Sequence, residues 1–152
     1  MNLRDLELRP EDDYPEGRRF SARSLTREVG AQLTGMAVYE LAPGDATWPY
    51  HWEVGNEEWL IVIDGELTLR TPEGERVLRA GDVAAFPAGP TGAHAVRNHS
   101  GAPARFAMPS TQVRYGDATV YPDSGKFAIG GFDDWWHRGY LGEKVEYWEG
   151  ET

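Results

Sequence analysis

Short segments of alternating hydrophobic and polar residues, separated by turns, run through most of this chain. The clearest is Glu57–Asp64, which is rich in β-branched and aromatic residues and ends at a Gly65–Glu66 turn. Leu67–Thr71 follows as its partner, and Pro72–Glu75 makes the next turn. Successive side chains of a strand lie on opposite faces, so such alternation marks half-buried strands. The pattern predicts antiparallel strands joined by tight turns.

The same pattern of short strands separated by turns continues on both sides of this region. Further strands are expected at Leu33–Leu41, Thr47–Trp52, Arg76–Arg79, Val83–Pro87, His94–Asn98 and Arg105–Met108. No amphipathic helix separates them. This order is typical of an antiparallel sandwich or barrel and not of alternating strand–helix units, so the predicted fold class is all-β.

The two ends of the chain differ from the middle. Residues 1–17 are polar and are expected to form an arm against the barrel or a partner subunit, and residues 18–116 form the barrel itself. Residues 117–152 form an aromatic-rich C-terminal extension, in which a helical turn is expected at 132–141. Its large aromatic side chains are expected to pack on the barrel or across a dimer. They are Trp135, Trp136, Tyr140, Tyr147 and Trp148.

The charge and the amino-acid composition exclude several classes of partner and of functional site. The net charge of −10 argues against nucleic acid as a partner, and no basic run suggests a membrane surface. The absence of cysteine excludes disulfides, thiolate zinc sites and a cysteine nucleophile. The N-terminus lacks the apolar segment of a signal peptide, and the longest hydrophobic run, Trp59–Ile63, is too short to span a bilayer. A cytoplasmic protein that binds a small molecule is therefore expected.

Four residues are candidates for metal chemistry: His51, Glu53, Glu58 and His94. His51 and Glu53 are two apart in an extended segment and point the same way. Glu58 follows a turn at 54–56, so it can lie opposite them, and His94 comes from a later strand. Imidazole and carboxylate ligands suit Fe, Mn, Ni or Zn. The spacing alone is equally compatible with ordinary surface histidines and glutamates.

Two stretches resemble the paired motifs of the cupin superfamily. In the first, Gly44 supplies a turn, His51-Trp52-Glu53 stands where a His-x-His pair belongs, and Glu58 is followed by six residues and Gly65. In the second, Gly81 is followed by five residues and Pro87-Ala88-Gly89, then by His94 and Asn98. The sequence of the segment GNEEWLIVIDGELTLRTPEGE is similar to that of small bacterial cupins of the cupin 2 type.

This resemblance implies a single double-stranded β-helix, which is a jelly-roll barrel, and often a homodimer. It also implies one divalent metal ion, held by His51, Glu58 and His94. Glu53 departs from the pattern, because the motif usually has a second histidine there. It is a fourth ligand, a catalytic base beside a three-ligand site, or the mark of a lost metal.

The predicted function is a metal-dependent enzyme that acts on a small polar molecule, a sugar or a carboxylate. The resemblance allows an isomerase, a dioxygenase or a decarboxylase. The alternative is a non-catalytic barrel that binds or senses a small ligand, or a structural dimer with a vestigial site. Glu57 has the opposite strand parity to Glu58 and is expected to face outward. Asn98, His99 and His137 are expected to be structural or surface residues.

Overall fold

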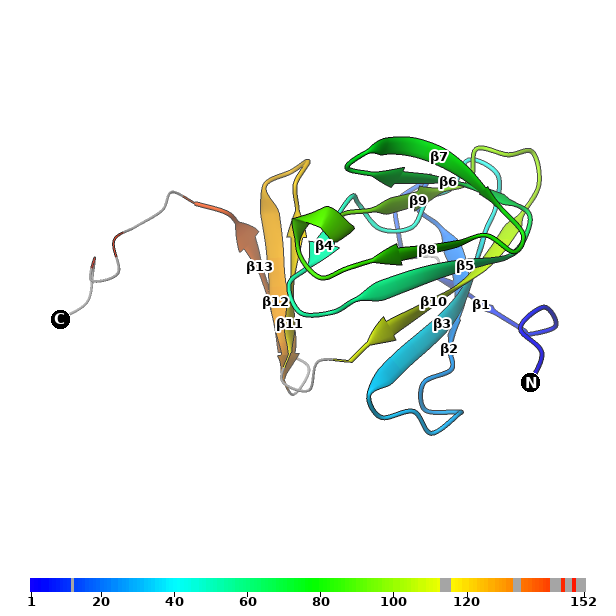
Figure 1. Ribbon diagram of the computed structural model, residues 1–152, viewed down its shortest axis with the longest axis horizontal. Helices are drawn as coiled ribbons and strands as arrows, with labels where there is room; N and C mark the ends of the chain where they lie inside the picture. Colours follow the sequence, from blue (N-terminus) through cyan, green and yellow to red (C-terminus); the bar gives the residue numbers. More distant parts are fainter. Residues whose placement is uncertain (12, 113–115, 133–134, 143–145, 147–148, 150–152) are drawn as a thin grey trace.

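Strands make up most of the computed structural model, which describes residues 1–11, 13–112, 116–132, 135–142, 146 and 149 (Figure 1). They are β1 (Arg9–Glu11), β2 (Phe20–Ser24), β3 (Thr34–Leu41), β4 (Trp52–Glu53), β5 (Glu58–Asp64), β6 (Glu66–Thr71), β7 (Gly74–Arg79), β8 (Val83–Phe86), β9 (Ala95–Arg97), β10 (Ala104–Thr111), β11 (Asp117–Tyr121), β12 (Lys126–Phe132) and β13 (Trp135–Tyr140). A short 3₁₀ turn, η1, spans Pro90–Gly92. Within these residues no helix is long and apolar enough to cross a membrane.

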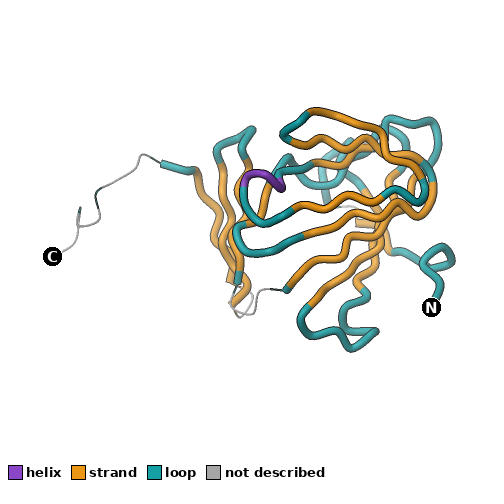
Figure 2. The backbone as a smooth tube through the Cα atoms, in the orientation of Figure 1, coloured by secondary structure: helices purple, strands orange, loops and turns teal. Residues whose placement is uncertain are grey.

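Two antiparallel sheets face each other around one core. One has the strand order β1-β2-β3-β10-β5-β8, and the other has the order β7-β6-β9. Figure 1 shows β5 and β8 running beside β6, β7 and β9, and the tube in Figure 2 shows that loops alone, with the single turn η1, connect them. This arrangement is the jelly roll, so the prediction of an all-β double-stranded β-helix is confirmed.

Alternate residues of the central strands form the core between these sheets. Leu60 and Val62 of β5, Leu67 and Leu69 of β6, and Phe106 of β10 are at most 2% exposed. Each buried side chain of this size contributes about 1.5–3 kcal/mol by leaving water. The period of two in the sequence therefore places one face of each strand inside the barrel.

The turn between β5 and β6 requires glycine. Gly65 has a φ of +78°, and a Cβ atom at this position would lie 2.7 Å from the carbonyl oxygen of Pro103. Positive φ and a close backbone neighbour together exclude larger residues. This turn carries the chain from β5 in the six-stranded sheet to β6 in the three-stranded sheet, so the prediction that Leu67–Thr71 pairs with Glu57–Asp64 is wrong.

A third sheet, with the order β13-β12-β11-β4, stands across one end of the barrel (Figure 1). The prediction of a helical turn at 132–141 is wrong, because β13 occupies most of this range and pairs with β12. Phe127 lies opposite Gly139, where a Cβ atom would come within 3.1 Å of its ring. Antiparallel pairing along β12 therefore decides the local conformation, as is common in sheets.

The aromatic residues of the C-terminal extension are only partly described. Tyr140 is 75% exposed and does not pack on the barrel of its own chain. The side chains of Trp135 and Trp136, and all of Tyr147 and Trp148, lie outside the described residues.

The N-terminal arm lies on the outer face of the six-stranded sheet. Leu3, Leu6 and Leu8 pack against a second buried cluster, made of Leu25, Val38 and Ala107. The guanidinium of Arg105 donates hydrogen bonds to backbone carbonyls of the arm and forms an ion pair with Glu40 at 2.8 Å. The arm is thus ordered against the barrel.

Candidate metal centre

Two histidines meet at the end of the barrel beside the third sheet. His51 directly precedes β4, and His94 directly precedes β9. Their backbones form an isolated antiparallel bridge, with N···O distances of 3.1 Å and 2.8 Å. Their ring centroids lie 4.7 Å apart. The bridge therefore joins the two sequence motifs directly.

Backbone carbonyls fix both imidazole rings. Nδ1 of His51 lies 2.9 Å from the carbonyl oxygen of Pro49, and Nδ1 of His94 lies 2.9 Å from that of Gly92. A carbonyl only accepts, so each Nδ1 carries the hydrogen and donates it. Each Nε2 is then an unprotonated lone pair that points into the site. A second hydrogen bond of this kind is what usually orients a metal-binding histidine.

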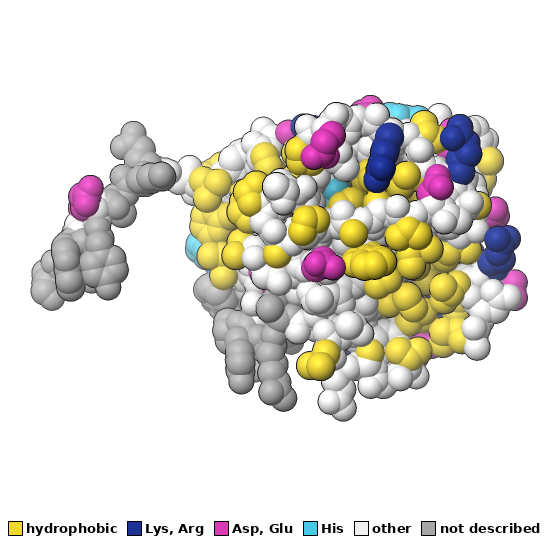
Figure 3. All heavy atoms as spheres, viewed as in Figure 1, with side chains coloured by type: hydrophobic (Ala, Val, Ile, Leu, Met, Phe, Trp, Pro, Cys, Tyr) yellow, Lys and Arg dark blue, Asp and Glu magenta, His cyan; other side chains and the backbone are white. Residues whose placement is uncertain are grey.

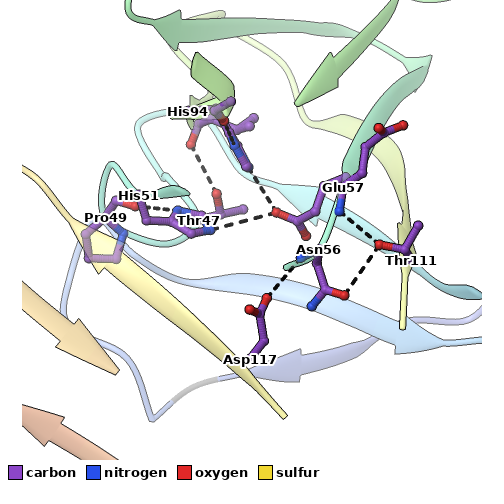
Figure 4. Close-up of polar contacts among 11 residues, drawn as sticks. Thr47, Pro49, His51, Asn56, Glu57, His94, Thr111 and Asp117 are labelled. Carbon is purple, nitrogen blue, oxygen red and sulfur yellow. Dashed lines mark hydrogen bonds and ion pairs between the residues drawn. The ribbon is translucent and has the colours of Figure 1, made fainter. Parts of the chain in front are cut away.

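Glu58, the first residue of β5, completes the group. Its Oε2 atom lies 3.9 Å from Nε2 of His51 and 3.5 Å from Nε2 of His94. In Figure 4 the dashed lines from His51 and His94 meet at a single carboxylate. The three ligand atoms all lie within 4.8 Å of one another. The structure thus brings together three of the four residues that the sequence proposed as ligands.

The polar atoms of this group fit a divalent cation. Oε2 of Glu58 and Nε2 of His94 are buried and, within the described part of the chain, have no hydrogen-bond partner. Leaving such atoms unpaired is costly, and a cation between them would satisfy them together. Two imidazoles and a carboxylate are a donor set for Mn, Fe, Ni or Zn.

The loop before His94 folds into η1. Gly92 ends this turn, and a Cβ atom there would lie 1.9 Å from the carbonyl oxygen of Pro87. The ring of Phe86 stacks on His94, with centroids 3.8 Å apart. The compact turn and the stacked ring hold His94 in place.

Glu53 lies outside the three-residue group. It is in β4, and its carboxyl interacts with Asn56 and Asp117. Asp117 also accepts hydrogen bonds from the backbone N–H groups of Gly55 and Asn56, at 2.8 Å and 3.2 Å. Asp117 therefore fixes the turn that connects Glu53 to Glu58, as Figure 4 shows for its contact with Asn56.

Burial sets the protonation of the site. Burial, together with the smaller effects of the nearby charges of Glu53 and Asp117, raises the pKa of Glu58 to about 8. Burial also raises the pKa of Glu53 to about 7. It lowers the pKa of His94 to about 3, helped by the neighbouring His51, and it lowers the pKa of His51 as well. Near neutral pH the imidazoles are neutral, Glu58 retains its proton until something displaces it, and Glu53 is partly ionised.

A cavity of about 510 Å³ opens beside this group, bounded by the third sheet and by aromatic residues of the barrel. His51, Glu53 and Glu58 line it, together with Tyr14, Tyr39, Trp48, Pro49, Thr119, Tyr121, Lys126, Phe127, Ala128 and Arg138. The ring of Tyr121 stacks beside that of His51, with centroids 5.9 Å apart. Arg138 acts electrostatically on Tyr121, lowering a pKa that burial raises.

Several candidates from the sequence lie away from the cavity. Glu57 is exposed and accepts a hydrogen bond from Trp59, as its strand parity predicts. Asn98 is fully buried and donates to the carbonyls of Leu41 and Ala102, which is a structural role. His99 and His137 are exposed.

The sequence analysis missed the cavity residues of the third sheet. Thr119 and Tyr121, and likewise Lys126 and Ala128, are two apart on strands that flank the turn at 122–125. This alternation was visible in the sequence. The sequence does not show that β11 pairs with β4, because this pairing joins residues more than sixty positions apart.

The cupin domain model matches residues 37–109, a range that contains both histidines and Glu58. Among curated proteins, none matches this chain in sequence. The solved structure of a sugar phosphate isomerase from Silicibacter pomeroyi, of the cupin superfamily, is 26% identical and superposes with a TM-score of 0.80. The match covers 92% of this chain and 91% of that one.

Two further solved structures share the fold. A putative sugar phosphate isomerase from Acidithiobacillus ferrooxidans is 20% identical, with a TM-score of 0.81 over 95% of this chain and 93% of that one. An oxalate decarboxylase with Mn(II) centres from Bacillus subtilis is 23% identical, with a TM-score of 0.53 over 76% of this chain and 30% of that one. With its jelly-roll fold, its two motifs and these matches, the chain belongs to the cupin superfamily as a small protein of the bacterial cupin 2 type.

Proposed function

We propose that this cupin is a metal-dependent isomerase of a small sugar-type substrate. One observation carries the proposal: two neutral imidazoles and a buried carboxyl converge beside a cavity whose wall holds a second carboxyl, Glu53. The first three groups suit a divalent ion, and the fourth suits proton transfer. An isomerase of hydroxy-carbonyl compounds needs both functions.

His51, Glu58 and His94 would hold the ion. When bound, a divalent ion supplies Lewis-acid polarisation of substrate oxygens. The protein keeps the two imidazoles correctly oriented through the carbonyls of Pro49 and Gly92. The aromatic side chains of the cavity, Tyr39 and Trp48 among them, limit the access of water to the site.

Glu53 is the proposed base. Burial holds its pKa at about 7, close to the value at which a group both accepts and donates protons at neutral pH. The Glu53 carboxylate would take the proton from the hydroxyl-bearing carbon beside a substrate carbonyl. It would return that proton to the former carbonyl carbon, while the hydroxyl proton moves to the former carbonyl oxygen. Glu53 ends the cycle unchanged.

The similarity to the Silicibacter pomeroyi protein supports this choice among the cupin activities. That protein is described as a sugar phosphate isomerase, and the two chains match over more than nine-tenths of their lengths. The match to oxalate decarboxylase covers less than a third of that enzyme and supports the fold alone.

The test follows exchange of substrate hydrogen. The Mn(II)-loaded protein is incubated in D₂O with aldoses, ketoses and their phosphates, and proton NMR records deuterium entry at carbon and conversion of each compound. We expect conversion of at least one of them. Because general base catalysis contributes about 10²–10⁴-fold, Glu53→Gln should lose a factor of this size.

Glu57→Gln is the matched control, since it removes a neighbouring carboxylate that faces outward. It should retain activity. Equal rates for Glu53→Gln and the unaltered protein would show that Glu53 is not the base. Metal binding with no exchange in any compound would contradict the isomerase and favour the non-catalytic ligand-binding barrel.

A further inference from the structure

Two basic side chains of the third sheet line the cavity beside His51. Lys126 is the first residue of β12, and Arg138 lies in β13. They are the lysine and arginine residues that line this cavity. In a chain with 15 basic and 25 acidic residues, two basic side chains beside one cavity stand out.

Strand pairing places both on the inner face of the third sheet. In one row, Glu53 pairs with Thr119, Thr119 with Ala128, and Ala128 with Arg138. Directly opposed residues of antiparallel strands point to the same face. Arg138 therefore shares the cavity face of Glu53.

A second row runs beside it. The ring of His51 stacks beside Tyr121, and Tyr121 pairs with Lys126. Lys126 and Ala128 are two apart in β12, so they also share this face. The two rows connect the metal group at one side of the sheet with the two cations at the other.

The spacing suits a small extended substrate. Neighbouring strands are about 4.8 Å apart, so the backbone of β12 lies about 10 Å, and that of β13 about 14 Å, from that of β4. Flexible side chains at these positions can contact a charged group several atoms away from a carbonyl that is bound near the histidines.

Within the described part of the chain, no carboxylate neutralises either cation. Among the described residues, neither Lys126 nor Arg138 takes part in an ion pair. Arg70, by contrast, is held by Asp123 at 2.6 Å, and Arg105 by Glu40 at 2.8 Å. The carboxyls of the cavity, Glu53 and Glu58, belong to the opposite side of the site.

We infer that Lys126 and Arg138 form an anion subsite that binds the phosphate of a phosphorylated substrate while its carbonyl end faces His51, Glu58 and His94. The inference rests on the proposed function for the reaction, and it assigns the residues that select phosphorylated compounds. A guanidinium and an ammonium are the usual protein partners of phosphate oxygens.

The test measures binding of inorganic phosphate and of sugar phosphates beside their parent sugars, by calorimetry on the full chain. The double variant Lys126→Gln/Arg138→Gln should bind every phosphorylated probe about tenfold or more weakly, because it loses two charge-assisted contacts. Its affinity for the parent sugars and its metal content should not change. Arg27→Gln/Arg76→Gln removes the same charge from exposed positions elsewhere and should behave as the unaltered protein.

Three results would overturn the inference. They are equal phosphate affinity in the double variant and the unaltered protein, an equal loss in the control pair, and no binding of phosphorylated probes to the unaltered protein. These outcomes are separate from failure of the proposed function. A protein without metal or exchange activity whose phosphate binding still depends on Lys126 and Arg138 keeps the subsite and loses the isomerase. An active isomerase that prefers parent sugars keeps the proposed reaction and loses the anion subsite.

Discussion

Gly92 determines where the imidazole of His94 lies. Its carbonyl accepts the hydrogen of Nδ1, and its α-carbon faces the backbone of Pro87 with no room for a methyl group. Adding one carbon here must move either the turn η1 or the strand that precedes it. The position of a proposed metal ligand thus depends on a residue that has no side chain.

Gly92→Ala should therefore weaken metal binding without removing any ligand atom. We expect about a 10–100-fold loss of affinity, as is typical when a residue that orients a ligand is changed. Titration with Mn(II) or Zn(II) measures it. Gly101→Ala, where a Cβ atom meets nothing within 4 Å, is the matched control. An unchanged affinity in Gly92→Ala would show that the turn is free to relax.

Glu58 should set the pH dependence of metal binding. Its pKa of about 8 means that it holds a proton at neutral pH in the metal-free protein, whereas His94, with a pKa of about 3, does not. A cation must displace the Glu58 proton, so apparent affinity should rise about tenfold per pH unit and level off above about pH 8. Calorimetry in buffers of different ionisation enthalpy counts the released protons. A dependence confined to pH values below about 6 would indicate competition at imidazole instead.

The same shift affects the stability of the metal-free protein. A carboxyl whose folded pKa is raised binds more protons in the folded state between its ordinary pKa and the raised one. Its stabilising contribution is present at low pH and is lost as the pH rises through about 8. The two histidines act in the opposite direction only below about pH 6.5, since their lowered pKa values disfavour the folded state there.

At the scale of elements, the third sheet depends on a side-chain clamp. Arg70 of β6 donates two hydrogen bonds, of 2.6 Å and 2.9 Å, to the carboxylate of Asp123 in the turn between β11 and β12. Its guanidinium also lies 3.9 Å from the centre of the Tyr50 ring. The clamp joins the three-stranded sheet of the barrel to the hairpin that carries Lys126.

Arg70→Met should lower the free energy of unfolding by about 1 kcal/mol, the upper range for a solvent-exposed ion pair with good geometry. Urea denaturation measures the change. Arg76→Met on β7, an exposed arginine for which the described residues form no ion pair of this kind, should change stability by less than about 0.5 kcal/mol. Equal effects of the two substitutions would mean that the clamp contributes nothing.

Elements whose side chains alternate strictly could be predicted from the sequence. Val62 and Leu69 mark the buried faces of β5 and β6, and the turn residue Gly65 marks their junction. The strand β13 could not be predicted, because its sequence lacks alternation and its conformation comes from pairing with β12. The alternation of hydrophobic and polar residues predicts a strand only where that strand buries one of its faces.

At the scale of the whole molecule, one outer face is apolar. Trp59 and Val83 are 45% and 50% exposed on β5 and β8, and they lie beside Ile61 and Ala85 in the same outward rows. Figure 3 shows hydrophobic side chains gathered over this part of the surface. The arm covers the neighbouring part of the same sheet. We propose that a second copy of the chain covers this β5–β8 face, because patches of this kind mark interfaces.

Val83→Asp should therefore convert a dimer into a monomer at tens of micromolar protein, since a charge would be buried in the contact. Sedimentation velocity distinguishes the two states. Leu33→Asp, at an apolar position that is 76% exposed in a loop, should leave the dimer intact. An unaltered protein that sediments as a monomer would refute the interface.

The part of the candidate site that lies within the two short sequence motifs could be predicted. His51, Glu58 and His94 follow from motif spacing, and the structure brings them together. Lys126 and Arg138 were not found, because they reach the cavity only through the pairing of β11 with β4, of β12 with β11 and of β13 with β12. The proposed metal ligands belong to the barrel, whereas the residues that would select the substrate come from the third sheet.

Metal analysis after loading shows whether His51, Glu58 and His94 bind one divalent ion. The unaltered protein and His99→Ala, which changes an exposed histidine, should each retain about one ion per chain. His51→Ala/His94→Ala should retain almost none while remaining folded by circular dichroism. Retention of one ion by the double variant, or no ion in the unaltered protein under any loading condition, would contradict the account.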